Sequence, residues 1–135
     1  MASILKVDTI TGVTTAGSIA VTGEGNSTTT NLQQGLAKSW LNYDQKDTIT
    51  IRDSFNVASV ADDGSGAFTP AYTSNMANGN YAPHMCSIAT TSNLGFNRLG
   101  SVANTQTGSC QYVHYENSNG TDTDLLAISV DGDLA

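Results

Sequence analysis

Apolar and polar residues alternate over short segments throughout residues 35–135, which is the period-two pattern of half-buried β-strands. Residues 125–130 are a clear example, because Leu126, Ile128 and Val130 share one phase. The strands predicted in this way cover residues 37–43, 48–57, 67–72, 81–89, 109–116 and 125–130. Their number and regular spacing are typical of a β-rich domain.

Turn signals separate these strands. Asp62–Gly66 and Asn117–Gly120 are rich in Asp, Asn and Gly, which tolerate the positive φ of tight hairpin turns. A change of phase predicts a β-bulge near residues 58–59. Pro70 predicts that its strand lies at a sheet edge, because proline donates no ladder hydrogen bond. We therefore predict an all-β fold for residues 35–135, an antiparallel β-sandwich of about six to eight strands.

Residues 1–34 differ from the rest of the chain. They contain no aromatic residue, and their apolar residues stand apart among Thr, Gly, Ser and Asn. A lone chain of this composition cannot bury enough apolar area to offset the entropy of ordering it, whereas three copies around one axis can. We interpret residues 1–34 as an extended shaft or docking arm that neighbours hold in order. A disordered polar leader is the alternative that composition leaves open. The low-complexity connector at residues 23–31 marks the boundary with a head domain, residues 35–135.

The charge pattern excludes several classes of partner. Only 13% of the residues are charged, so Ser, Thr, Asn, Gln and Gly must cover the surface. The net charge is −7 and the five Lys and Arg are scattered, which argues against nucleic acid and an anionic membrane surface. No apolar run approaches the roughly 20 residues of a membrane span, so we expect no membrane insertion. The first residues lack the features of a secretory signal, so we expect synthesis in a cytoplasm.

No set of residues in the sequence predicts catalysis. His84 and His114 are candidate bases, but each lies in a predicted strand, where a buried structural histidine is more common. The motifs of a serine nucleophile and of a phosphate-binding loop do not occur. The Asp pairs at 62–63, 122–124 and 131–133 fall where Asp forms turns, so neither a glycosidase nor a calcium site is predicted. We expect no enzyme, no metal and no cofactor.

Cysteine and aromatic residues leave two questions open. Cys86 and Cys110 are either two free thiols on strands or one bridge between strands. Six aromatic residues either form a platform on which a ligand stacks or pack within the protein. They are Trp40, Tyr43, Tyr72, Tyr81, Tyr112 and Tyr115.

Several phrases of the chain resemble the fibre proteins of tailed bacteriophages, especially the short fibre and tail-fibre-like proteins of phages with marine hosts. At the N-terminus the phrase is Leu5-Lys6-Val7-Asp8-Thr9-Ile10. Within the β-rich part the phrases are Ala37-Lys38-Ser39-Trp40, Ile51-Arg52-Asp53-Ser54-Phe55-Asn56-Val57, Asp63-Gly64-Ser65-Gly66, Phe68 to Tyr72, and Asn80-Tyr81-Ala82. Together they cover about a third of the chain firmly.

The resemblance implies a structural virion protein, a tail or capsid fibre that forms a homotrimer and attaches to other virion proteins through its N-terminal part. It also allows recognition of a host-surface glycan by the distal domain. On this hypothesis seven apolar residues line the threefold axis or a docking groove: Ile4, Leu5, Val7, Ile10, Val13, Ile19 and Val21. The chain has almost no shaft, which places direct receptor binding in doubt. A capsid decoration or adaptor protein, a carbohydrate-binding module and a small virion-associated hydrolase are the alternatives.

Overall fold

The chain forms two compact units, and its described residues contain β-strands and no α-helix. The computed structural model describes residues 4–13, 19–22, 29–32, 35–87, 95–100 and 104–134. The first unit is Met1–Leu36 and the second is Ala37–Ala135. Across the described ranges, no helix has the length and apolar character needed to span a membrane.

A small β-hairpin is the regular structure described in the first unit. Strand β1, Ala20–Thr22, pairs antiparallel with β2, Thr29–Asn31. The backbone N–H of Leu32 donates to the carbonyl of Ile19 at 2.9 Å and extends the pairing by one hydrogen bond. Strand β2 falls inside residues 23–31, which the sequence predicted as a connector, so the end of that connector is structured.

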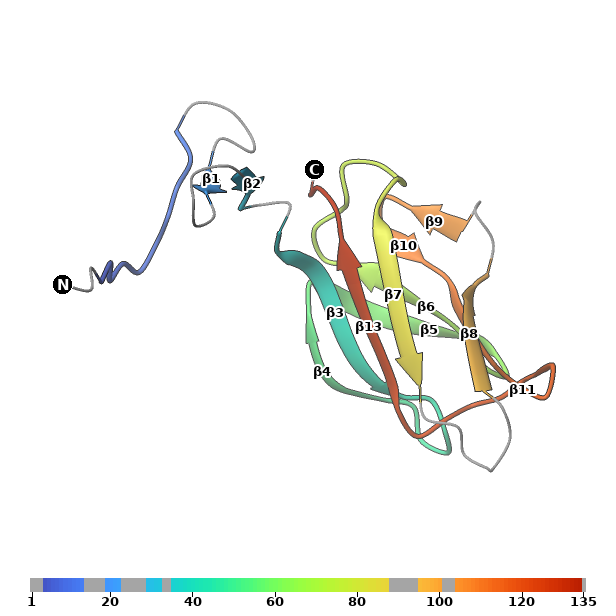
Figure 1. Cartoon of the computed structure of the whole chain (residues 1–135). Coiled ribbons are helices and arrows are strands. Elements are labelled where there is room, and N and C mark those ends of the chain that lie inside the picture. The colour runs from blue at the N-terminus through green and yellow to red at the C-terminus, as the bar shows by residue number, and fades with distance from the viewer. Residues whose placement is uncertain are drawn as a thin grey trace. The chain divides into compact units, whose positions relative to one another are not determined.

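The first sheet of the second unit has four antiparallel strands in the order β4-β3-β13-β7 (Figure 1). Their bounds are β4, Thr50–Phe55; β3, Ala37–Asp44; β13, Leu126–Asp131; and β7, Ala82–Ser87. Ile128 of β13 lies opposite Leu41 of β3 on one side and Met85 of β7 on the other. The last predicted strand therefore lies in the interior of this sheet.

The second sheet is built around strand β6, which pairs with other strands on both of its sides. On one side β6 pairs with β5, and on the other it pairs with β10 and β11. Strand β11 also pairs with β8 and β12, and β10 also pairs with β9. The bounds are β5, Val57–Gly64; β6, Ala67–Tyr72; β8, Gly95–Leu99; β9, Thr105–Gln106; β10, Ser109–Cys110; β11, Tyr112–Glu116; and β12, Asn119–Gly120.

The two sheets share one apolar core (Figure 1). The rings of Tyr43 from the first sheet and Phe68 from the second lie 5.2 Å apart between centroids. The core also contains Leu41, Tyr72, Met76, Tyr81, Cys110, Tyr112, Leu126, Ile128 and Val130. The all-β, antiparallel part of the prediction is confirmed, and the arrangement is consistent with a β-sandwich. Among the described residues the second unit has eleven strands rather than about six to eight, and three of them, β9, β10 and β12, are two-residue segments.

Pro70 does not mark an edge strand, contrary to the sequence prediction. Strand β6 is flanked on both sides, and Pro70 is buried. The ladder beyond β6 pairs Ala71 with Ser109 and resumes with Phe68 opposite Tyr112. The interruption between β10 and β11 therefore lies beside Pro70, so the ladder is broken where proline could not contribute a donor.

The predicted strand at residues 48–57 is divided at Asn56, where the chain passes from the first sheet to the second. Asn56 has φ 57°, a left-handed conformation that asparagine tolerates. Beyond it, the register shift between Val57 and Ser59 is the bulge predicted from the sequence. The expectation of a half-buried strand face is wrong, because Ile51 and Phe55 are exposed.

The side chain of Asn56 holds this corner with three hydrogen bonds. Its Nδ2 donates to the carbonyls of Lys38 at 2.9 Å and Ser74 at 3.0 Å, and its Oδ1 accepts from the backbone N–H of Ser74 at 2.6 Å. We expect Asn56→Ala to lower the free energy of unfolding by about 2–4 kcal/mol, since it removes these bonds and disfavours positive φ. Urea denaturation measures the change.

The matched control is Asn117→Ala, because Asn117 is exposed and also has positive φ, 49°. This control loses the conformational preference alone and should cost about 1 kcal/mol. Equal unfolding midpoints for Asn56→Ala and Asn117→Ala would contradict the role given to the three hydrogen bonds.

Candidate functional site

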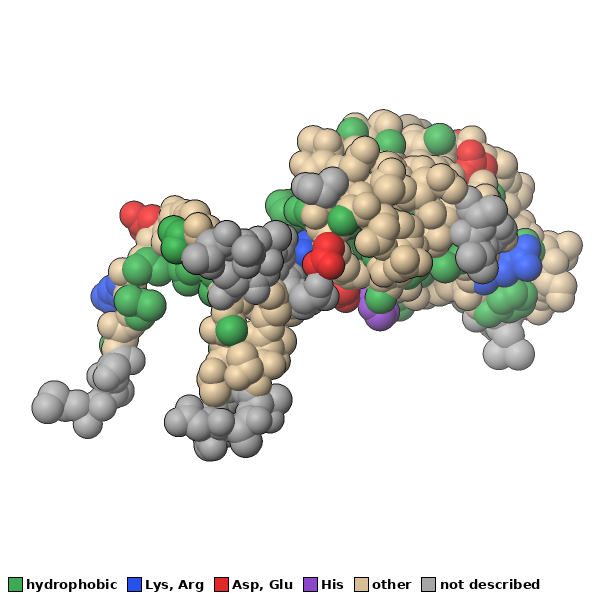
Figure 2. Space-filling view, turned by 90° about the horizontal axis from the view of Figure 1, so that it is seen from above, with side chains coloured by type: hydrophobic (Ala, Val, Ile, Leu, Met, Phe, Trp, Pro, Cys, Tyr) green, Lys and Arg blue, Asp and Glu red, His purple; other side chains and the backbone are tan. Residues whose placement is uncertain are grey.

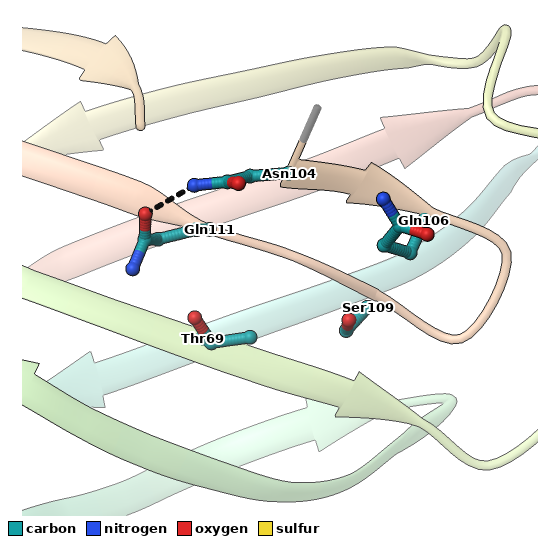
Figure 3. A pocket seen from close by; sticks show the side chains of 5 residues that line it. All are labelled: Thr69, Asn104, Gln106, Ser109 and Gln111. Carbon is teal, nitrogen blue, oxygen red and sulfur yellow. Dashed lines mark hydrogen bonds between the residues drawn. The ribbon is translucent and has the colours of Figure 1, made fainter. Parts of the chain in front are cut away.

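A polar groove on the second sheet is a candidate site in the part of the chain that the structure describes. Its volume is about 310 Å³. Two hydroxyl and three amide side chains line it, as Figure 3 shows: Thr69, Ser109, Asn104, Gln106 and Gln111. The groove is open to solvent, and its lining includes no charged side chain.

Hydrogen bonds fix two sides of the groove. Asn104 Nδ2 donates to Gln111 Oε1 across it (Figure 3). Gln111 Nε2 donates to Asp63 Oδ2 at 3.0 Å, and the Thr69 hydroxyl donates to the same oxygen at 2.5 Å. Asp63 of β5 thus links Thr69 of β6 to Gln111, which lies between β10 and β11, and it orients the amide of Gln111.

The groove lies where the ladder on β6 is interrupted. Thr69 adjoins Pro70, and Gln111 occupies the break between β10 and β11. From the core side, the Tyr81 hydroxyl bonds to the carbonyls of Gln106 and Ser109, each at 2.9 Å. A hydroxyl carries one proton, so it donates to one carbonyl at a time. Tyr81 therefore supports the hairpin that forms one wall of the groove.

Four of the six predicted ligand-stacking aromatics lie in the core, which corrects that prediction for them. They are Tyr43, Tyr72, Tyr81 and Tyr112. The rings of Tyr43 and Tyr112 both pack against Phe68, with centroid distances of 5.2 Å and 5.6 Å. A buried ring offers no face to a ligand from solvent, so these residues serve packing.

The other two aromatics are accessible but lie on different sheets. Trp40 of β3 is 37% exposed and lies opposite Phe55 of β4. Tyr115 of β11 is half-buried and stacks on Phe96, with 5.2 Å between ring centroids. Arg98 covers the Tyr115 ring at 4.6 Å. The structure therefore does not bring the six together into one platform. The stacked pair of exposed Phe96 and half-buried Tyr115 is an aromatic surface that the sequence did not predict.

The predicted docking residues are exposed wherever the structure gives their burial, except for Ile19, which is half-buried. Leu5 is 81% exposed and Val13 is 91% exposed. Residues 4–13 contain no strand. Figure 2 shows apolar side chains along this segment, whereas backbone and uncharged polar side chains make up most of the visible face of the second unit.

The two histidines lie in different environments. His84 is exposed, and its Nε2 lies 3.3 Å from Asp131 Oδ2. His114 is fully buried. Its Nδ1 lies 2.9 Å from both Ser87 Oγ and Asn97 Oδ1, and its Nε2 lies 3.7 Å from Glu116 Oε1. This group contains the residue types of a nucleophile with its base, but a base with no exposed surface cannot reach a substrate.

Carboxylates and thiols add no metal or redox centre among the described residues. No three His, Cys, Asp or Glu there are arranged to hold a metal ion. Asp122 accepts the backbone N–H of Gly66 at 2.6 Å, and Asp62 accepts that of Gly64 at 3.0 Å, so both stabilise turns as predicted. Cys86 is exposed, Cys110 is buried, and both are free thiols.

The sequence reading missed the groove residues. The segment Asn104–Gln111 has an amide or hydroxyl side chain at six of its eight positions, but such residues are as common in loops and on exposed strand faces, and the sequence predicted only a strand from Ser109. Only the fold brings Thr69 beside it. Comparison of the chain with protein-family models, with curated proteins and with solved structures finds no match.

Proposed function

We propose that this chain is a structural protein of a phage virion, a fibre or appendage subunit on the tail or capsid. In this proposal it forms a homotrimer and attaches to other virion proteins through its N-terminal segment. It is made in the host cytoplasm, and its function is attachment rather than catalysis.

One observation carries the proposal: residues 4–13 expose every large apolar side chain that they contain. These are Ile4, Leu5, Val7, Ile10 and Val13. Fully burying a side chain of this size stabilises a protein by about 1.5–3 kcal/mol. A partner that covers these five residues would therefore gain a large stabilisation from their burial. Copies of the same segment or a groove on another virion protein can supply that partner.

The second unit supports a structural role. Its core is formed within Ala37–Ala135, so its fold does not depend on the segment that attaches. His114 is buried and therefore out of reach of a substrate, which favours attachment over hydrolysis. A polar but weakly charged surface suits a protein that stays exposed on a particle.

Deleting residues 1–31 should leave a folded head that no longer incorporates into particles. Light scattering should give a full-chain mass of three times 14.0 kDa, about 42 kDa, and a smaller assembly for the truncated chain. Circular dichroism checks that the head remains β-structured. Normal incorporation of the truncated chain would contradict the docking role.

A point variant tests the docking role without shortening the chain. Leu5→Asp places a charge among the exposed apolar residues and should reduce incorporation at least tenfold, because burying an unpaired carboxylate is unfavourable. Thr9→Asp, also exposed, is the matched control and should incorporate normally. A monomeric full chain would favour the alternative of a decoration or adaptor protein, whose N-terminal segment is covered by another virion protein.

A further inference from the structure

We propose that the polar groove of Thr69, Asn104, Gln106, Ser109 and Gln111 binds a neutral saccharide. This inference goes beyond the proposed attachment to a particle and does not depend on it, because the groove lies within the second unit.

The chemistry of the lining fits sugar hydroxyls. A sugar hydroxyl both donates and accepts hydrogen bonds, and so do serine and threonine hydroxyls and the amides of asparagine and glutamine. An amide has two N–H donors and an oxygen with two lone pairs. The described bonds of Gln111 use one of its donors and one lone pair, so it can also bond to a ligand.

The groove is also ordered before a ligand arrives. Asp63 orients Thr69 and Gln111, and Asn104 bonds to Gln111 across the groove. Side chains that are already held lose less conformational freedom on binding, which favours affinity. The Tyr81 hydroxyl holds the backbone of the β9–β10 hairpin on the core side.

Charge and size narrow the ligand to a neutral saccharide of one or two rings. The lining contains no Lys or Arg, Asp63 lies directly behind it, and the net charge of the chain is −7. All three features disfavour an acidic sugar. A volume of about 310 Å³ is at the small end of the range for ligand clefts.

The test measures binding of the full chain to a printed array of neutral and acidic glycans, followed by saturation-transfer NMR with the free form of each neutral saccharide bound. We expect binding to neutral glycans with terminal hexose units and none to the acidic ones. Binding to acidic glycans alone, or to no glycan on the array, would overturn the proposal.

Two variants assign the binding to the groove. Gln111→Ala should weaken it at least tenfold. Thr69→Val is the second variant: it keeps the side-chain shape, removes the hydroxyl, which also bonds to Asp63, and should weaken binding at least threefold. Thermal unfolding confirms that each variant folds. Unchanged affinity in folded samples of both would refute the groove as the site.

The matched control is Phe96→Ala, because Phe96 is an exposed aromatic residue of β8 in the same sheet but does not line the groove. We expect its affinity to stay within twofold of the unaltered chain. Loss of binding in Phe96→Ala with retention in Gln111→Ala would place the saccharide on the aromatic surface and overturn the proposal. Particle incorporation is a separate readout, so failure of one proposal leaves the other testable.

Discussion

Gly66→Ala is expected to abolish folding of the second unit. Gly66 has φ 71°, and an added Cβ would lie 2.2 Å from the carbonyl oxygen of His114 and 2.5 Å from the backbone nitrogen of Thr121. These are backbone atoms joined to each other by a 3.2 Å hydrogen bond, so neither can move without breaking the sheet. The expected loss exceeds about 4 kcal/mol, most of the stability of a domain of this size.

The matched control is Gly64→Ala, two residues earlier in the same turn. Gly64 also has positive φ, 109°, but an added Cβ there would meet no atom within 4 Å. It should therefore cost only the conformational strain, about 1–3 kcal/mol. Circular dichroism and urea unfolding measure both variants. A cooperatively folded Gly66→Ala protein with the stability of Gly64→Ala would show that the close approach is not required.

The contact at Gly66 also joins the two predicted turns to each other. Gly120 of β12 is the counterpart of Gly66, because its added Cβ would lie 2.2 Å from the carbonyl oxygen of Ser65. The backbone N–H of His114 also donates to the Gly66 carbonyl at 2.8 Å. The β5–β6 turn and the β11–β12 hairpin therefore interlock through glycines. Turn residues predicted both turns, but their mutual contact depends on tertiary structure.

The alternation of apolar and polar residues was sufficient to predict the strands that bury one of their two faces. In β13, Leu126, Ile128 and Val130 are all buried, and the predicted phase is the core face. Alternation does not reveal which neighbours a strand acquires. Pro70 therefore suggested an edge, whereas the strand is internal with its ladder broken beside the proline. Likewise, Ile51 and Phe55 share a phase on a strand that pairs only with β3, and both are exposed.

The candidate groove could not be predicted because it combines residues far apart in the chain. Thr69 is a polar residue on β6 and Gln111 is a polar residue between β10 and β11, and such residues are ordinary on any β-sheet surface. Their joint bonding to Asp63 appears only once β6 and β11 are neighbours. The aromatic prediction failed for a related reason, because a tyrosine in a strand fits the core as well as the surface.

Alkaline unfolding is expected between about pH 10 and pH 12, because four of the five tyrosines are buried. Burial raises the pKa of Tyr43 and of Tyr72 to about 12, and for Tyr43 the carboxylates of Asp62, Asp122 and Asp44 add to the effect. Burial likewise raises the pKa of Tyr81 and Tyr112. The folded protein therefore holds phenol protons that the unfolded chain releases near pH 10.

The number of protons that the folded and unfolded states bind decides whether stability rises or falls with pH. Below pH 10 both states keep these protons, so the groups do not alter stability. Between pH 10 and the raised pKa, each protonated tyrosine lowers the free energy of unfolding by up to about 1.4 kcal/mol per pH unit. Four tyrosines together can remove up to about 11 kcal/mol within two pH units, which is comparable to the about 5–15 kcal/mol of a typical domain. Absorbance at 295 nm should rise in one step with the loss of β-structure.

Tyr43→Phe tests the contribution of one group. Among the described residues, the Tyr43 hydroxyl has no hydrogen-bond partner, so the variant should keep its stability at neutral pH to within about 1 kcal/mol. Its alkaline midpoint should shift upward, because one buried proton no longer has to be retained. Titration of all the tyrosines near pH 10 with the β-structure intact would show that their hydroxyls reach solvent in the folded state, and the packing of the core around Tyr43 and Phe68 would then be wrong.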